Sequence, residues 1–83
     1  MSDIIIYTSS FCPYCIQAKR LLNKKNISFV EINISKEPVK RVEMMQKSQQ
    51  RTVPQIFNGD SHIGDCMQIY AFEQDGKLDE LLA

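Results

Sequence analysis

The segment Ile4–Cys15 reads Ile-Ile-Ile-Tyr-Thr-Ser-Ser-Phe-Cys-Pro-Tyr-Cys, and it decides the fold. Residues Asp3–Thr8 form a short run rich in β-branched side chains that stops at two serines, a pattern that predicts a buried strand. From Pro13 to about Lys25 the apolar residues recur at helical spacing, and proline suits the first turn of a helix. The chain therefore passes from strand to helix at a Cys-x-x-Cys pair.

Two further segments continue this alternation of strand and helix. Residues Ile27–Asn33 alternate with a period of two, which predicts a second strand. Ser35 can cap a helix that has Pro38 in its first turn and runs to about Ser48. We expect the inward face of this helix to carry Val39, Val42 and Met45.

The second half of the chain predicts a hairpin followed by two helices. A turn signal at Asn58-Gly59 lies between Val53–Phe57 and a short strand around His62–Ile63. A helix follows from about residue 66 to residue 74. A last short helix contains Leu78, Leu81 and Leu82.

The predicted architecture is an α/β fold with the order β-α-β-α-β-β-α and a short C-terminal helix. A crossover helix between the first two strands implies that they are parallel, whereas the hairpin adds antiparallel strands. We therefore expect a mixed, four-stranded sheet with helices on both faces. With 83 residues, the chain is long enough for a single domain, residues 1–83, with one modest core.

Charge and cysteine content limit the classes of function. Ten Lys and Arg balance ten Asp and Glu, so the chain lacks the net positive charge that holds proteins on nucleic acid or anionic membranes. The apolar run Ile4–Ile6 is too short for a signal-peptide core or a membrane span. Three cysteines, of which only Cys12 and Cys15 are close in sequence, do not fit a secreted disulfide scaffold. We expect a cytoplasmic monomer with no nucleic-acid or membrane partner.

The cysteine pair has the arrangement that thiol-disulfide exchange requires. Cys12 should lie beside unpaired N–H groups at the positive end of the helix dipole, a placement that favours the thiolate form of a cysteine. Cys15, one helical turn along, faces inward with Ala18 and Leu22 and should remain a thiol until it is needed. We therefore predict that Cys12 is the nucleophile and Cys15 the resolving cysteine.

A zinc domain is the structural alternative for these cysteines. Cys12, Cys15, His62 and Cys66 supply four candidate ligands. Structural zinc sites usually combine Cys-x-x-Cys with a second such pair or with two histidines, a spacing that this chain lacks. We expect no metal site, and we expect His62 to be structural rather than a base.

Four segments together resemble the glutaredoxin family, in particular bacterial dithiol glutaredoxins with a Cys-Pro-Tyr-Cys centre. They are Ile6–Thr8, Cys12–Cys15, Thr52–Phe57 and His62–Gly64, and the likeness runs nearly from end to end. The resemblance implies a thioredoxin-like fold and glutathione-dependent reduction of protein disulfides and glutathionylated proteins. It also implies that glutathione regenerates the protein as a co-substrate, with no bound cofactor.

The resemblance further implies a binding site for glutathione. In glutaredoxin-like proteins the peptide bond corresponding to Val53–Pro54 is cis, and the backbone of Val53 pairs with the cysteinyl part of glutathione. Tyr14, Thr52, Val53 and Pro54 thereby become binding positions. Pro13, Pro54 and Gly64 are expected to shape the site.

This chain departs from the family pattern at the turn after Gly64. Asp65 stands where relatives usually have a second glycine, Cys66 occupies a position that is small, polar or cysteine, and Met67-Gln68 replace acidic residues. We expect Asp65 to hold the γ-glutamyl ammonium in place of the missing acid. Cys66, next to this pocket, is a candidate for oxidation or glutathionylation, although most free cysteines are buried and inert.

A second departure precedes the cysteine pair. Many relatives have a lysine there, where this chain has Ser9 and Ser10. The glycine carboxylate of glutathione must then find another cation, and Arg51 and Lys47 are the candidates. Both departures predict weaker binding of glutathione than is usual in the family.

Two rival functions use the same resemblance. One is a redoxin recharged by thioredoxin reductase, against which the lack of Trp before Cys12 and of a Gly-Pro dipeptide argue. The other is an iron–sulfur cluster carrier that uses Cys12 and glutathione, which Pro13 makes less favourable by restricting the backbone. Tyr70 and Phe72 are expected to be ordinary core and surface residues of a helix.

Overall fold

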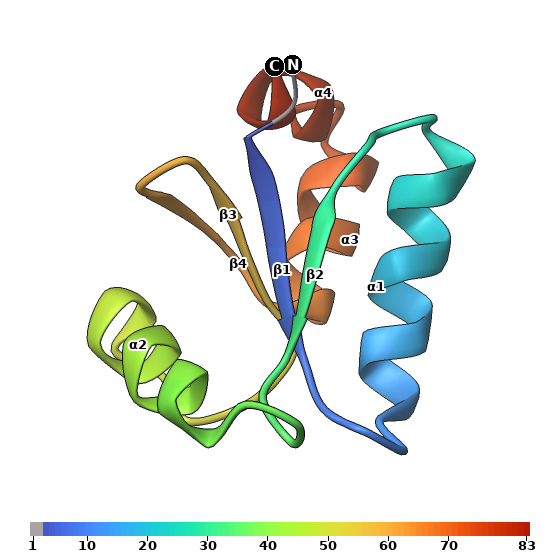
Figure 1. Cartoon of the computed structure of the whole chain (residues 1–83). Helices are drawn as coiled ribbons and strands as arrows, with labels where there is room; N and C mark the ends of the chain where they lie inside the picture. Colours follow the sequence, from blue (N-terminus) through green and yellow to red (C-terminus); the bar gives the residue numbers. More distant parts are fainter. Residues whose placement is uncertain (1–2) are drawn as a thin grey trace.

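The computed structural model describes residues 3–83 as a four-stranded sheet with four helices packed on it (Figure 1). The elements in chain order are β1 (Ile4–Thr8), α1 (Pro13–Lys24), β2 (Val30–Asn33), α2 (Pro38–Ser48), β3 (Gln55–Asn58), β4 (Ser61–Gly64), α3 (Cys66–Gln74) and α4 (Leu78–Leu82). The strand order is β2-β1-β3-β4. This architecture confirms the predicted α/β class and the order of elements.

The pairing of the strands is mixed, as the connections predict. β1 is parallel to β2, with α1 as the crossover, and antiparallel to β3. β3 and β4 form the antiparallel hairpin, with an irregularity between Ile56 and Phe57. Because Tyr7 pairs with Gln55 and Ile56 with Gly64, the end of β1, the start of β3 and the end of β4 share one end of the sheet.

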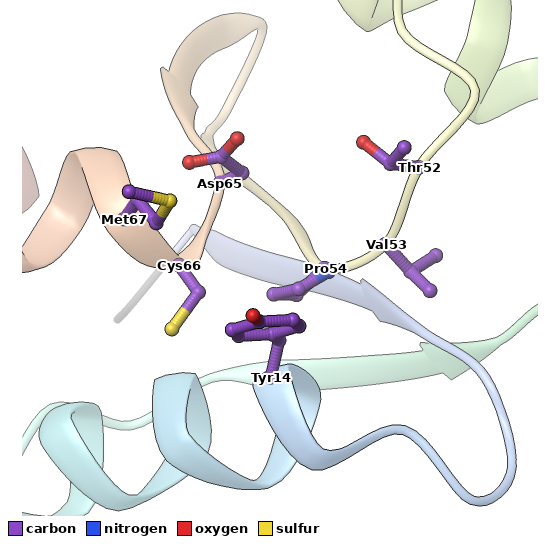
Figure 2. Close-up of a pocket in the computed structure, with 7 residues that line it drawn as sticks. All are labelled: Tyr14, Thr52, Val53, Pro54, Asp65, Cys66 and Met67. Carbon is purple, nitrogen blue, oxygen red and sulfur yellow. The ribbon is translucent and has the colours of Figure 1, made fainter.

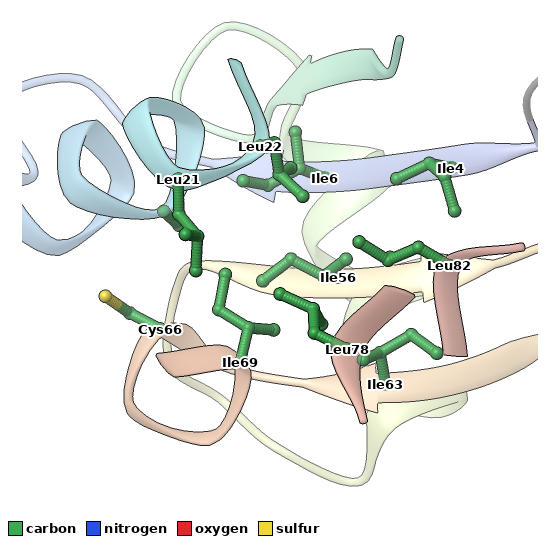
Figure 3. Close-up of a cluster of buried hydrophobic side chains, with 11 residues drawn as sticks. Ile4, Ile6, Leu21, Leu22, Ile56, Ile63, Cys66, Ile69, Leu78 and Leu82 are labelled. Carbon is green, nitrogen blue, oxygen red and sulfur yellow. The ribbon is translucent and has the colours of Figure 1, made fainter. Parts of the chain in front are cut away.

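Alternating side chains of the strands divide the core between the two faces of the sheet. Ile4 and Ile6 point to the face covered by α1, α3 and α4, where they join Ala18, Leu21, Leu22, Ile56, Ile63, Cys66, Ile69, Leu78 and Leu82 (Figure 3). The opposite face carries a smaller cluster of Tyr7, Ile34, Met44 and Phe57 beneath α2. Helices thus cover both faces (Figure 1).

β2 is shorter than the sequence predicts. Residues 27–29 lie outside the strand because the chain uses them to leave α1, and the Ile27 N–H donates to the Leu22 carbonyl at 2.9 Å. Ile27 and Phe29 nevertheless pack against the larger core cluster, which accounts for their apolar character.

Two predictions for α2 are wrong. The N-cap is Glu37 rather than Ser35, whose hydroxyl instead accepts the Ser10 N–H at 3.2 Å. Val39 and Val42 are 80% and 54% exposed, while Met44 is fully buried. The physical reason is tertiary: the buried Tyr7 hydroxyl donates to Glu43 Oε2 at 2.6 Å, and this contact turns Glu43 and Met44 toward the sheet.

The helix lengths bear on one class of location. Among residues 3–83 no helix is long and apolar enough to cross a membrane.

α1 and α3 both begin at the end of the sheet where β1 stops, and the candidate site is built there (Figure 1).

Candidate active site

Cys12 is the N-cap of α1. Its backbone is extended, and its Sγ accepts the Cys15 N–H at 3.2 Å. The sulfur is partly exposed. The first N–H groups of a helix have no partner within the helix, and the Cys12 sulfur lies where such a group can donate to it. The geometry predicted for a nucleophilic cysteine is therefore present.

Cys15 is protected where Cys12 is open. Its side chain is 1% exposed and lies on the inward stripe of α1 with Ala18 and Leu22. Burial and the hydrogen bond with Cys12 raise the pKa of the Cys15 thiol to about 12, against smaller opposing effects of the Ser9 backbone and Lys19. Cys15 is therefore a thiol at neutral pH, as a resolving cysteine in waiting must be.

The loop before β3 forms the opposite wall of the site. The Val53–Pro54 peptide bond is cis, which confirms the expectation drawn from the resemblance. The carbonyl oxygen of Val53 lies 4.0 Å from Cys12 Sγ, so the backbone of this loop faces that sulfur.

Buried Gln55 holds this loop in place. Its Nε2 donates to the Thr52 carbonyl at 3.0 Å and to Thr52 Oγ1 at 3.3 Å. Its Oε1 must then accept, so the contact of 2.7 Å with His62 requires the proton on His62 Nε2. Burial lowers the pKa of His62, which favours the neutral imidazole, and its hydrogen bond to Gln55 supports the loop.

The N-terminus of α3 is closed by a capping box. Asp65 Oδ1 accepts the Gln68 N–H at 3.0 Å, and Gln68 Oε1 accepts the Asp65 N–H at 2.9 Å. Gly64 precedes it with φ of +145°, and a Cβ there would lie 2.5 Å from Gln68 Oε1 and 2.8 Å from Gln68 Cβ. Glycine is thus required on two grounds, backbone conformation and space.

A cleft of about 270 Å³ lies between these walls (Figure 2). Its lining residues are Tyr14, Thr52, Val53, Pro54, Asp65, Cys66 and Met67. The structure thus brings together six of the residues that the sequence singles out for glutathione. The ring of Tyr14, from the first turn of α1, lies next to Pro54 (Figure 2).

The cationic candidates lie outside this cleft. Arg51 is exposed in the loop before Thr52 and does not line the cleft. Lys47 lines a separate hollow with Asp3 and Gly59. A role of Arg51 in binding stays a prediction.

Cys66 is buried at the start of α3. Burial raises the pKa of its thiol, and the nearby Asp65 and Cys12 raise it further. Of the candidate zinc ligands, His62 is engaged with Gln55, and within residues 3–83 no three His, Cys, Asp or Glu side chains are grouped to hold a metal ion.

Two residues of the site are missing from the sequence-based list. Met67 lines the cleft although its side chain is 75% exposed, and the available signal was its place where relatives have an acidic residue of the glutathione-binding turn. Gln55 supports the loop from within the sheet. The capping box had a readable signal, Asp65-x-x-Gln68, since Asp at the N-cap and Gln three residues later are typical of it.

Known proteins resemble the chain in sequence and in structure. The sequence profile of the Glutaredoxin family matches residues 4–63. Glutaredoxin 3 of Escherichia coli is 48% identical over 82 residues, covering 99% of this chain and 99% of that protein. The solution structure of glutaredoxin from Brucella melitensis is 51% identical with a TM-score of 0.85, covering 99% of this chain and 89% of that one. The crystal structure of a buckwheat glutaredoxin–glutathione complex is 28% identical with a TM-score of 0.88, covering 98% and 76%.

Proposed function

Because the chain belongs to the glutaredoxin family, we propose that it is a glutathione-dependent thiol-disulfide oxidoreductase with Cys12 as nucleophile and Cys15 as resolving cysteine. The observation that carries the proposal is the contrast between the two sulfurs. Cys12 is accessible and receives a helix N–H, whereas Cys15 is buried one turn away with its pKa raised to about 12.

The first step is attack on a disulfide. The Cys12 thiolate forms a bond to one sulfur of the substrate, the substrate S–S bond breaks, and the departing thiolate takes up a proton. When the substrate is a glutathionylated protein, the protein thiol leaves and glutathione remains on Cys12.

Two routes then return Cys12 to the thiolate. In one, a second glutathione attacks the bound glutathione sulfur, which releases oxidised glutathione. In the other, Cys15 loses its proton, attacks Cys12 Sγ and expels the substrate thiol, leaving a Cys12–Cys15 disulfide that two glutathione molecules reduce. The second route reduces protein disulfides and needs both cysteines.

The cleft beside Cys12 supports glutathione as the co-substrate. Tyr14, Thr52, Val53 and Pro54 line it, and the Val53 carbonyl faces the reactive sulfur. The buckwheat relative of similar fold is a complex with glutathione. We expect the partners to be glutathione and disulfide-containing or glutathionylated proteins, and the compartment to be the cytoplasm.

The test is glutathione-dependent reduction of a small mixed disulfide, coupled to glutathione reductase and NADPH. Wild type and Cys15→Ser should be active, because the one-cysteine route needs only Cys12. Cys12→Ser should lose at least about a thousandfold in rate, since Cys12 is the N-cap of α1 and the other two thiols, Cys15 and Cys66, are buried. Inactive wild type would overturn glutathione as reductant and direct the search to thioredoxin reductase.

A further inference from the structure

We propose that the cleft beside Cys12 selects extended protein segments that carry a basic residue and an apolar residue next to their disulfide cysteine. This proposal rests on the thiol-disulfide chemistry proposed above and names the substrate class of the same site. Glutathione remains the reductant, with weaker binding than such a segment.

The cleft carries a single negative charge. Among its described lining residues the only charged side chain is that of Asp65. Its Oδ1 accepts the Gln68 N–H, while Oδ2 has no bond to any other residue in the described part of the chain. Asp65 Oδ2 can therefore accept a hydrogen bond from an approaching ammonium or guanidinium group.

The capping box makes the same end of the cleft unsuited to an anion. A helix N-terminus ordinarily attracts carboxylates through its N–H groups. Here the Asp65 and Gln68 N–H groups are already engaged, at 2.9 and 3.0 Å, which leaves those of Cys66 and Met67 beside the Asp65 carboxylate. Glutathione, which carries two carboxylates and one ammonium, matches the charge at this end of the cleft only in part.

A second hollow continues the cleft along α1 and α3. It measures about 280 Å³ and shares Tyr14, Cys66 and Met67 with the first. Its far end includes Tyr70, whose hydroxyl donates to the Gln17 carbonyl at 3.0 Å and joins the two helices. No charged residue lines it within residues 3–83.

The exposed side chains between the two hollows are apolar. Tyr14 is 58% exposed and Met67 75% exposed, and both line the two hollows. A strand advances roughly 3.3 Å per residue, so when a substrate cysteine meets Cys12 its nearest neighbours in sequence can lie over these side chains. A segment of protein, unlike a tripeptide such as glutathione, is long enough to continue past Tyr14 toward Tyr70. The cleft lies beside Cys12, since Val53 lines it, and Asp65 gives it a single negative charge. Both features favour a protein segment that carries one cation and one apolar residue next to its cysteine.

The test uses reduced protein and three peptides of equal length, each capped on its cysteine with thionitrobenzoate. Beside the cysteine the first peptide carries Leu and Lys, the second Leu and Glu, and the third Ser and Lys. Cys12 attacks the peptide sulfur and thionitrobenzoate leaves as the coloured thiolate. Cys15 then attacks Cys12 and releases the peptide thiol, so the protein dithiol is the reductant and no glutathione is present.

We expect the Leu-Lys peptide to react about fivefold faster than the Leu-Glu peptide. It should also react about fivefold faster than the Ser-Lys peptide, because Leu buries apolar surface that Ser lacks. Asp65→Asn, which keeps a capping side chain, should lower the ratio of the Leu-Lys rate to the Leu-Glu rate toward one. Met67→Ser should lower the ratio of the Leu-Lys rate to the Ser-Lys rate. Asp60→Asn and Val39→Ser, exposed positions away from the cleft, serve as controls and should change neither ratio.

Two results would overturn the proposal: ratios that Asp65→Asn and Met67→Ser leave unchanged, or faster reaction of thionitrobenzoate-capped glutathione than of all three peptides. Both are independent of the coupled assay. Inactivity there with the peptide ratios intact would remove only glutathione as reductant.

Discussion

The N-termini of α1 and α3 face the same cleft and are built on the same local plan, yet one carries a partly exposed thiol and the other is closed by a capping box. In α1 the N-cap is Cys12, and its sulfur accepts the N–H of the residue three positions on, Cys15, at 3.2 Å. In α3 the N-cap is Asp65, and its carboxylate accepts the N–H of Gln68 at 3.0 Å. A Cys-x-x-Cys motif and a capping box thus occupy equivalent positions of a helix.

The two helix ends differ in the side chain that lies three residues after the N-cap, which is Cys15 in α1 and Gln68 in α3. The Gln68 side chain has no redox chemistry. Its Oε1 accepts the Asp65 N–H, and this hydrogen bond fixes the end of α3. Cys15 instead points inward as a buried thiol that is hydrogen-bonded with Cys12, and it can form a covalent bond to Cys12 only after giving up its proton. One capping geometry thus gives rigidity when its side chains are a carboxylate and an amide, and suits redox chemistry when they are two thiols.

The largest effect should come from breaking the fixed end. Gly64→Ala places a side chain on a backbone with φ of +145° and brings its Cβ within 2.8 Å of Gln68 Cβ, so the capping box must open. We expect a loss of about 3 kcal/mol in the free energy of unfolding, measured by urea denaturation.

Gly59→Ala is the matched control for that variant. Gly59 also has positive φ, +60°, but nothing lies within 4 Å of the position of its Cβ. It should cost only about 1 kcal/mol, the penalty of the left-handed backbone alone. Equal losses for the two alanines would show that contact with Gln68 contributes nothing.

A smaller effect, which depends on pH, is expected at the N-terminus of α1. The pKa of Cys15 is raised to about 12 in the folded protein, chiefly by burial, while in the unfolded chain it returns to its ordinary value. The folded state then holds the proton more tightly, so its stability is complete below about pH 8.5 and falls as pH rises above that value. We expect the free energy of unfolding to fall by up to about 1.4 kcal/mol for each pH unit above pH 9.

The measurement is urea denaturation of the reduced protein at several pH values from neutral to about 10, beside Cys15→Ala. Cys15→Ala retains Cys12 and Cys66, so the difference in slope between the two proteins isolates Cys15. Parallel slopes would mean that Cys15 is not held as a thiol by the fold.

Much of this site was predictable because its decisive interactions are local. Pro13 and the stripe of Cys15, Ala18 and Leu22 define α1 through spacing alone, and the structure places them as predicted. The inward face of α2 was not predictable in this way, because the Tyr7 to Glu43 hydrogen bond joins residues far apart in sequence.

The cleft divides in the same manner. The cis bond at Val53–Pro54 came from the resemblance to glutaredoxins, since spacing carries no such signal. The place of Met67 on the cleft depends on how α3 packs against α1, a tertiary fact. Asp65-x-x-Gln68, by contrast, is a local signature that predicts the capping box directly.

The most direct test of the central claim is to find which sulfur takes up glutathione. Cys15→Ser protein is treated with oxidised glutathione, digested without reductant and analysed by peptide mass spectrometry. The account predicts a single glutathione on Cys12 and an unmodified Cys66, because Cys66 is buried and its thiol pKa is raised. An unmodified Cys12, or glutathione on Cys66 in its place, would contradict the assignment of Cys12 as the nucleophile.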